Sequence, residues 1–148
     1  MKLENSAGIM GTSIARVRSE ADQKQNKKIR FTLEAGNSGS AVVLHCEGRI
    51  VFRDEARALA AIVADVLPSA HRMVLNLAGV DSVDSGALGE LVLTHMWAEA
   101  AGYTLKFASP RKSVRSLFEI NQLASIFDVY GSVPEAMAAM VQEEIHPS

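Results

Sequence analysis

Several features that define common protein classes are scarce in this sequence. Its 148 residues include one cysteine, Cys46, so no disulfide can form within the chain. Lys and Arg number 15 against 17 Asp and Glu, without the basic excess of nucleic-acid-binding domains. No apolar run approaches the roughly 18 residues that cross a bilayer, and residues 1–11 lack the continuous apolar stretch of a secretory signal. We therefore expect a soluble, cytoplasmic protein with no membrane span and no direct contact to nucleic acid.

Signatures of cofactor and metal chemistry are missing as well. The sequence contains no glycine-rich loop of the kind that cradles nucleotide phosphates. His45 and Cys46 are neighbours in a strand-like segment, where successive side chains point to opposite faces, which disfavours a metal pair. We expect neither a cofactor nor a metal site.

The sequence does contain enough apolar material for one core. Apolar residues make up 48% of the chain, and a chain of this length buries roughly 68–70% of its unfolded surface when it folds as one domain. The first residues have scattered apolar positions and a polar tract at 22–28, which is typical of a flexible arm. We predict a flexible N-terminal extension over residues 1–28 and a single folded domain over residues 29–145.

The predicted domain begins with strand-like segments. Apolar and polar residues alternate over 29–34, the pattern of a half-buried strand, and a turn is expected at 36–39. Apolar runs at 41–44 and 50–52 flank a polar triplet, which indicates either two short strands or one strand bent by a bulge. These segments predict an antiparallel start to the sheet.

Helix-like and strand-like segments then alternate along the chain. The first predicted helix covers 54–67 and is ended by Pro68, and the second covers 85–101. The third is opened by Ser109-Pro110 and ended by a left-handed cap at Asn121. The last begins with Ser132 and Glu135 as a capping box. The predicted strands cover 73–77 and 103–107, and a short apolar stretch lies at 126–130. This alternation predicts the α/β class, with a mixed β-sheet packed against helices.

The most informative segment joins the buried strand 73–77 to the helix that begins at Ser85. Asp84-Ser85 stands at the start of that helix, where unpaired backbone N–H groups and the positive end of the dipole favour an anion such as phosphate. The alternative is that Asp84 or Ser85 serves only as an N-cap, a common role for both residue types that is worth about 1 kcal/mol. Local chemistry leaves both interpretations open.

The order of residues around this loop resembles the STAS family. The matching series runs through Gly79-Val80, Asp84-Ser85, Leu88-Gly89, Ala101-Gly102, Ser109-Pro110, Leu123, Phe127 and Ser132-Val133. The resemblance covers about residues 29–141 and implies a STAS-like, anti-sigma factor antagonist-like domain without catalytic residues.

In the anti-sigma factor antagonists of this family, the serine after the Asp is phosphorylated by a partner kinase that is also the anti-sigma factor. A PP2C-type phosphatase reverses the modification. The resemblance thus implies that Ser85 is a phosphorylation site in a non-enzymatic regulatory module, which binds its partner when Ser85 is unmodified and releases it when Ser85 is phosphorylated. The chain departs from the family pattern at Gly86-Ala87, where Ser, Thr or Ala and then Gly is usual, and at Asn76, where Asp is common.

Charge gives the expected release a physical basis. A phosphate adds about −1.5 to −2 charge units beside Asp81 and Asp84, so a surface that docks on a partner when unmodified becomes repulsive and costly to desolvate. The predicted partner-binding loop therefore includes Asp81, Asp84, Ser85 and Gly86. The sequence leaves the oligomeric state open.

The helix that begins at Ser85 supplies a second part of the predicted docking surface. At 100° per residue it has two apolar sides, one with Leu88, Leu91, His95 and Ala98, the other with Leu93, Met96, Trp97 and Ala100. One side must cover the sheet, which leaves Leu93 and Trp97 for a partner. The alternative is that Trp97 packs under the N-terminal extension.

Two other functions compete with this interpretation. A small serine hydrolase would combine Ser85 with Asp81 or Asp84 and a histidine. However, no Gly-x-Ser-x-Gly turn is present, and His95 lies about 15 Å along the helix axis from Ser85, while His45 and His71 stay open as bases. Within the STAS family, the alternatives are a stressosome scaffold or an accessory subunit of a lipid-transport ATPase.

Overall fold

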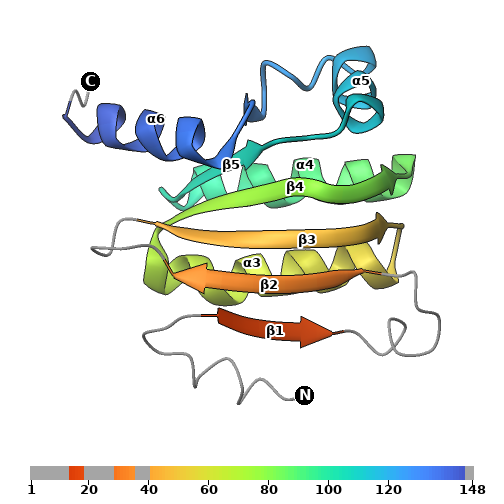
Figure 1. Ribbon diagram of the computed structural model, residues 1–148, viewed down its shortest axis with the longest axis horizontal. Helices are drawn as coiled ribbons and strands as arrows, with labels where there is room; N and C mark the ends of the chain where they lie inside the picture. Colours follow the sequence, from red (N-terminus) through yellow and green to blue (C-terminus); the bar gives the residue numbers. More distant parts are fainter. Residues whose placement is uncertain (1–13, 19–28, 36–40, 146–148) are drawn as a thin grey trace.

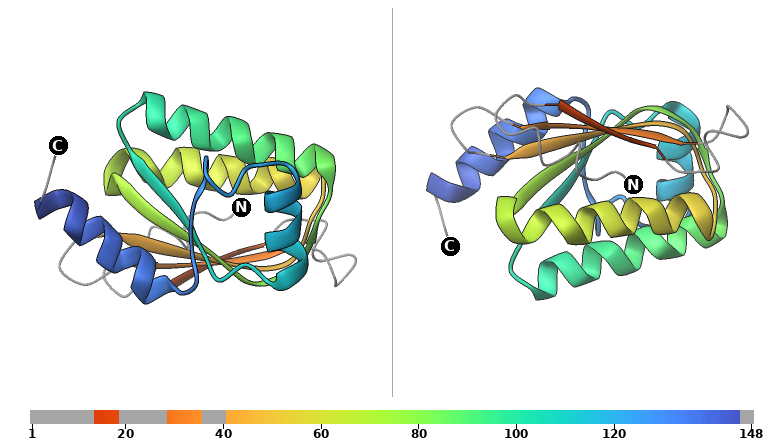
Figure 2. Two further views of the ribbon diagram at one scale, coloured as in Figure 1. Left: turned by 90° about the horizontal axis from the view of Figure 1, so that it is seen from above. Right: turned by 90° about the horizontal axis from the view of Figure 1, so that it is seen from below.

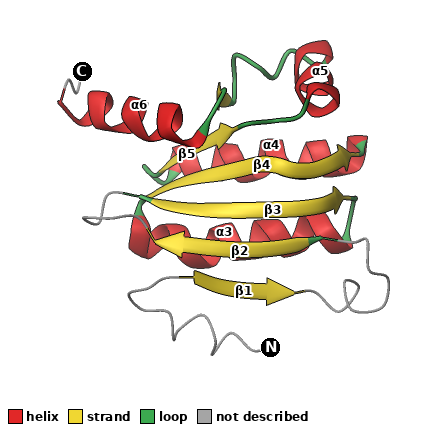
Figure 3. Cartoon of the chain, in the orientation of Figure 1, coloured by secondary structure: helices red, strands yellow, loops and turns green. Residues whose placement is uncertain are grey.

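The protein forms a mixed sheet in which the strands lie side by side in sequence order (Figures 1 and 3). A computed structural model describes residues 14–18, 29–35 and 41–145. The six strands are β1 (Ile14–Arg18), β2 (Arg30–Ala35), β3 (Val42–Ile50), β4 (Arg72–Val83), β5 (Thr104–Ala108) and β6 (Asp128–Tyr130). β1, β2 and β3 pair antiparallel, whereas β3 to β6 pair parallel. The predicted α/β fold and its antiparallel start are confirmed.

Helices cover both faces of this sheet (Figure 2). The helices are α3 (Asp54–Ala70), α4 (Ser85–Ala100), α5 (Lys112–Ile120) and α6 (Val133–Ile145). α3, α4 and α5 contribute to the main apolar core, together with one face of β2 to β5. α6 covers the opposite face and forms a smaller core there through Ala136 and Met140. None of the helices in the described part of the chain is long and apolar enough to cross a bilayer.

β3 is one strand with irregular pairing rather than two short strands. Its register against β4 shifts between His45 and Glu47 and again between Gly48 and Arg49. Gly48 has a φ of 117°, a conformation that glycine adopts without steric cost. These shifts let β3 continue beside β4 until Ile50 pairs with Val83, so the two strands end together at the start of α4.

One predicted helix end is wrong, and at another the predicted end is right but the cap conformation is wrong. α3 continues past Pro68 to Ala70 and ends at His71, whose φ is 68° and whose N–H donates to the Leu67 carbonyl at 2.6 Å. Pro68 lies inside α3, where it removes one N–H donor from the helix, and the helix continues for only two residues beyond it. α5 ends at Asn121 as predicted, but the left-handed residue is its neighbour Gln122, with a φ of 60°.

The capping box before α6 is present. The Glu135 N–H donates to the Ser132 hydroxyl at 3.2 Å, as predicted, while the Glu135 carboxylate accepts the Gly131 N–H at 3.1 Å. Near the other end of the chain, β1 lies within the predicted extension 1–28 and pairs with β2. The predicted turn at 36–39 and the rest of the extension lie outside the described residues.

A fully buried lysine joins α6 to the sheet. The Lys106 ammonium donates to Glu143 at 2.9 Å, to Asp128 at 3.1 Å and to the Tyr130 hydroxyl at 3.4 Å. Burial by itself would lower the pKa of Lys106, but the bonds to the two carboxylates outweigh it, and the pKa is raised. The carboxylates themselves are about half exposed, so water also solvates them.

We predict that removing the two carboxylates of this cluster destabilises the protein much more than removing the lysine. Asp128→Asn combined with Glu143→Gln leaves a buried charge without a counter-ion and lowers the free energy of unfolding by about 2–4 kcal/mol, whereas Lys106→Met changes it by less than about 1 kcal/mol. Urea unfolding at pH 7 measures both. The pKa of Lys106 is raised in the folded protein. Its contribution to the free energy of unfolding is therefore complete at pH values below its ordinary pKa of 10.5, and is lost only as the pH rises through the pKa of the folded state. Equal losses in the two variants would contradict the prediction.

Candidate functional site

The candidate site begins at Asp84, where the ends of two strands meet the start of α4. Asp84 is the N-cap of α4, and its carboxylate accepts the Ala87 N–H at 2.8 Å. The same carboxylate accepts the Phe52 N–H at 3.1 and 3.2 Å, and the Asp84 N–H donates to the Ile50 carbonyl at 3.3 Å. Asp84 therefore has the capping role that was the simpler of the two interpretations, and it also fixes the loop after β3.

Ser85 is the first residue of α4 and is exposed. Because Asp84 supplies the cap, the Ser85 hydroxyl is not needed for it and forms no hydrogen bond within the described part of the chain. The N–H groups of Ser85 and Gly86 lie in the first turn, where a helix offers no internal acceptor. An exposed hydroxyl thus stands at the positive end of a helix, a position that accommodates an anion.

Gly86 lies against the aromatic ring of Phe52. A Cβ atom added at Gly86 would lie 2.6 Å from Phe52 Cγ and 2.7 Å from Phe52 Cβ, distances that real side chains do not adopt. The glycine that departs from the family pattern is therefore required by close packing with the loop between β3 and α3. Phe52, with 45% of its surface exposed, and the adjacent Arg53, whose guanidinium lies 5.6 Å from the ring centroid, extend the site beyond the residues that were predicted.

Asp81 does not face Ser85 as a free negative charge. The Arg111 guanidinium donates to the Asp81 carboxylate at 2.7 Å and to the Ala78 carbonyl at 2.9 Å. Arg111 is the residue directly before α5 and lies far from Asp81 in the sequence. No local sequence pattern indicated this pair. Of the two acidic residues predicted at the site, Asp81 is therefore compensated by a cation, and Asp84 is held by backbone N–H groups.

One exposed stripe of α4 begins at Ser85. At 100° per residue, Ser85, Gly89, Leu93 and Met96 lie within about 80° of one another. All four are exposed, with 60% of Leu93 and 56% of Met96 accessible to solvent. The opposite side is buried, as predicted, by Leu88, Leu91, His95 and Ala98. The stripe is apolar after Ser85, which is unusual for an exposed helix surface.

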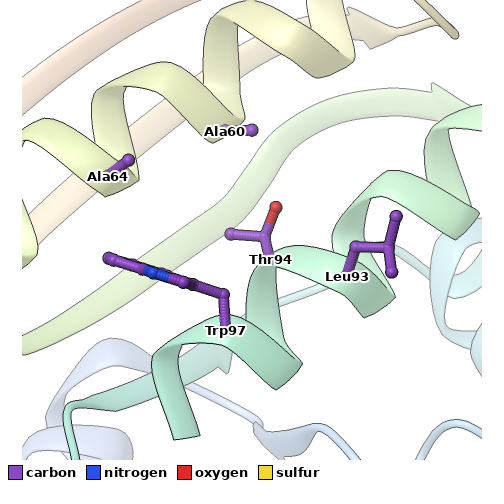
Figure 4. A pocket seen from close by; sticks show the side chains of 5 residues that line it. All are labelled: Ala60, Ala64, Leu93, Thr94 and Trp97. Carbon is purple, nitrogen blue, oxygen red and sulfur yellow. The ribbon is translucent and has the colours of Figure 1, made fainter. Parts of the chain in front are cut away.

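Trp97 borders this stripe and lines a hollow between α4 and α3 (Figure 4). Leu93, Thr94 and Trp97 of α4 lie on one side of the hollow, and Ala60 and Ala64 of α3 lie on the other. The Trp97 ring packs against Tyr103 with 5.6 Å between ring centroids, and 38% of the residue is exposed. The alternative contact of Trp97 with the N-terminal extension lies outside the described residues.

The described histidines occupy other environments. His95 is buried between the rings of Phe107 and Phe127, and His71 packs against Tyr103. His45 Nδ1 accepts a hydrogen bond from the Asn76 amide at 2.8 Å, and its Nε2 lies 2.7 Å from Glu34. In residues 29–35 and 41–145, no histidine forms a hydrogen bond with Ser85, so the arrangement of a serine hydrolase is not assembled there.

The described part of the chain also lacks a metal site. It contains no group of three or more His, Cys, Asp or Glu side chains placed to hold a metal ion. Cys46 is buried in the core, and burial raises the pKa of its thiol. This thiol therefore stays protonated and inaccessible.

Solved structures share the fold that carries this site. An anti-sigma factor antagonist from Mycobacterium paratuberculosis is 22% identical, with 78% of this chain and 97% of that chain covered and a TM-score of 0.66. The anti-sigma factor antagonist SpoIIAA in its unphosphorylated form is 20% identical over 76% of this chain and 96% of that chain, with a TM-score of 0.61. The phosphorylated Bacillus SpoIIAA is 17% identical over 74% and 97% of the two chains, with a TM-score of 0.57.

A family model identifies the class of domain. The model of the STAS domain matches residues 32–136, which include β3, β4, α4 and the Asp84-Ser85 loop. The chain belongs to the STAS domain family. A comparison with the curated proteins gives no match.

Two glycines of α4 give a matched test of the packing at the site. We predict that Gly86→Ala lowers the free energy of unfolding by about 1–2 kcal/mol, because the new Cβ must displace the base of the Phe52 side chain and not only its flexible tip. Gly89→Ala, one turn later, has nothing within 4 Å of its Cβ and gains about 0.5–1 kcal/mol from helix propensity. Chemical denaturation measures both. The prediction fails if Gly86→Ala is also stabilising, or if Phe52→Gly, which removes the clashing Cβ, does not relieve part of the loss in the Gly86→Ala background.

Proposed function

We propose that this chain is a phosphorylation-gated regulatory binding module of the anti-sigma factor antagonist kind, acting in the cytoplasm. In this proposal, its partner is an anti-sigma factor that is also a serine kinase. The partner binds when Ser85 is unmodified and is released when Ser85 is phosphorylated, and a PP2C-type phosphatase restores binding. The observation that carries the proposal is the exposed Ser85 hydroxyl at the head of an exposed apolar stripe on α4.

The geometry of the loop supports modification of Ser85 without unfolding. Asp84 caps the helix, so a phosphate on Ser85 removes no hydrogen bond found in the described part of the chain. The free N–H groups of the first turn favour the added negative charge. Phosphorylation is therefore expected to leave the fold intact and to act on binding alone.

The apolar stripe supports release by the phosphate. A partner that covers Ser85 together with Leu93 and Met96 excludes water from the whole stripe, so a phosphate of about −1.5 to −2 charge units would have to be desolvated there. Arg111 already neutralises Asp81, which leaves Asp84 as the nearest repulsive carboxylate. Desolvation of the phosphate then contributes more to release than repulsion from Asp81.

The first prediction concerns the switch itself. Ser85→Ala binds the partner within about threefold of wild type, whereas Ser85→Glu and the phosphorylated protein bind at least about tenfold more weakly, a difference of about 1.4 kcal/mol or more. Ser116→Glu is the matched control, since Ser116 is an exposed serine of α5 that belongs neither to the loop nor to the stripe. The partner is obtained by pull-down from the native host, and intact-mass measurement detects the gain of about 80 Da that one phosphate adds.

The pull-down also separates this function from the alternatives. Recovery of a serine kinase of the anti-sigma factor type, with the added mass on Ser85, supports the proposal. Recovery of a lipid-transport ATPase or of a stressosome assembly would instead assign the scaffold or accessory role. Equal affinity of the phosphorylated and unmodified proteins for the recovered kinase would refute the switch.

The second prediction concerns the stripe. Leu93→Asp weakens partner binding by about tenfold to a hundredfold, because it places a charge that must be desolvated at the centre of the contact. Ile120→Asp is the control, since Ile120 is 77% exposed at the end of α5 and is not part of the stripe. Isothermal titration calorimetry compares the two variants. Equal affinities for both would remove α4 from the docking surface.

A further inference from the structure

The outward face of α3 has no covering element in the described part of the chain. α3 and α4 form one layer against the sheet, and both views of Figure 2 show no described element on the outer side of this layer. α3 buries Ala56, Leu59, Val63 and Leu67 toward the core. Asp54 and Ser69 are exposed near its two ends, and the five exposed residues between them are Arg57, Ala61, Ala64, Asp65 and Pro68. We call these five residues the α3 face.

The α3 face continues into the apolar hollow beside it. Ala64 belongs to both, and Leu93 and Trp97 of α4 form the other wall of the hollow (Figure 4). The uncovered surface therefore combines large apolar side chains on α4 with short ones on α3. Short side chains allow a second helix to approach at the lower end of the usual 8–10 Å interaxial distance.

Arg57 and Asp65 are placed symmetrically about Ala61, whereas the exposed Asp54 at the start of α3 has no charged counterpart. Arg57 and Asp65 stand four residues before and after Ala61, which places them about 6 Å along the axis in opposite directions and about 40° to opposite sides. In an antiparallel pair of α3 helices, a two-fold axis that passes between them at Ala61 brings Arg57 of one copy to the height of Asp65 of the other. Within the described residues, neither side chain forms an ion pair.

We propose that a second copy of this chain binds on this surface, with the two α3 helices antiparallel about a two-fold axis at Ala61. Arg57 of each copy then lies opposite Asp65 of the other, so one contact forms two ion pairs. This self-complementarity is the reason for choosing a second copy over a different protein, because an isologous contact requires each patch to match itself. The inference centres on α3 and does not depend on the proposed function, whose docking stripe shares Leu93 with the edge of this surface.

The size of the surface sets the expected strength. A single helix pair buries less than the 1,200–2,000 Å² of a standard stable interface, so the dimer is weak, with a Kd of about 10–100 µM. Sedimentation equilibrium of the full chain between about 5 and about 500 µM should then show a monomer–dimer equilibrium. A chain that stays monomeric over this whole range would overturn the proposal.

Charge exchange identifies the surface. Arg57→Asp and Asp65→Arg each replace two attractions by two repulsions and raise the dimer Kd at least about tenfold. The double variant Arg57→Asp/Asp65→Arg restores both ion pairs and returns the Kd to within about threefold of wild type. Arg115→Asp, at an exposed arginine of α5, is the matched control and leaves the Kd unchanged. A dimer that is insensitive to either single reversal, or that the double variant does not recover, would exclude this geometry.

A covalent test is independent of the charges. Ala61→Cys places one thiol from each copy at the two-fold axis, and a mild thiol oxidant then joins them by removing two electrons and two protons to form one disulfide. The native Cys46 is 1% exposed and does not compete. We expect a cross-linked dimer from Ala61→Cys and none from Gln122→Cys, which is exposed beyond α5. Equal cross-linking of the two variants would contradict the proposal, and circular dichroism verifies that each variant is folded.

Discussion

The Asp84 carboxylate is the interaction on which the rest of the site depends. It accepts hydrogen bonds from the first turn of α4 and from the loop after β3, two segments that are distant in sequence. The backbone of Asp84 donates to the end of β3 at Ile50. A shorter side chain, or one with a single oxygen acceptor, would not tie the start of α4 to the loop that carries Phe52. The orientation of Ser85 follows from this one anchor.

Much of the fold could be predicted from the sequence because its signals are local. Alternation identified β2, helical spacing identified α3 to α6, and Asp84-Ser85 identified the head of α4. The bulge in β3 was one of two alternatives that local pattern could not separate. The choice depends on pairing with β4, a strand whose position is a property of the whole sheet.

The parts of the site that were missed depend on contacts between distant segments. Arg111 reaches Asp81 only because α5 begins beside the end of β4, and Phe52 reaches Gly86 only because β3 and β4 end together. The length of α3 was underestimated for a different reason. Proline removes an N–H donor and therefore predicts a helix end, but α3 continues for two residues beyond Pro68. Asp84 shows a further limit of sequence-based prediction. An aspartate that only caps a helix and one that also holds a neighbouring loop have the same sequence pattern.

Asn76 gives the sheet face on the α6 side a fixed hydrogen-bond direction. Its amide oxygen accepts the Ala78 N–H at 3.0 Å, which orients the amide and leaves its nitrogen to donate to His45 Nδ1. His45 Nδ1 must therefore be an acceptor, and the ring proton stands on Nε2, toward Glu34. Hydrogen bonds are thus donated from Asn76 on β4 to His45 on β3, and from His45 to Glu34 on β2. An aspartate at this position, as is common in the family, could only accept from Nδ1, so the ring would face a carboxylate at each nitrogen; the single amide therefore gives the chain of hydrogen bonds its direction.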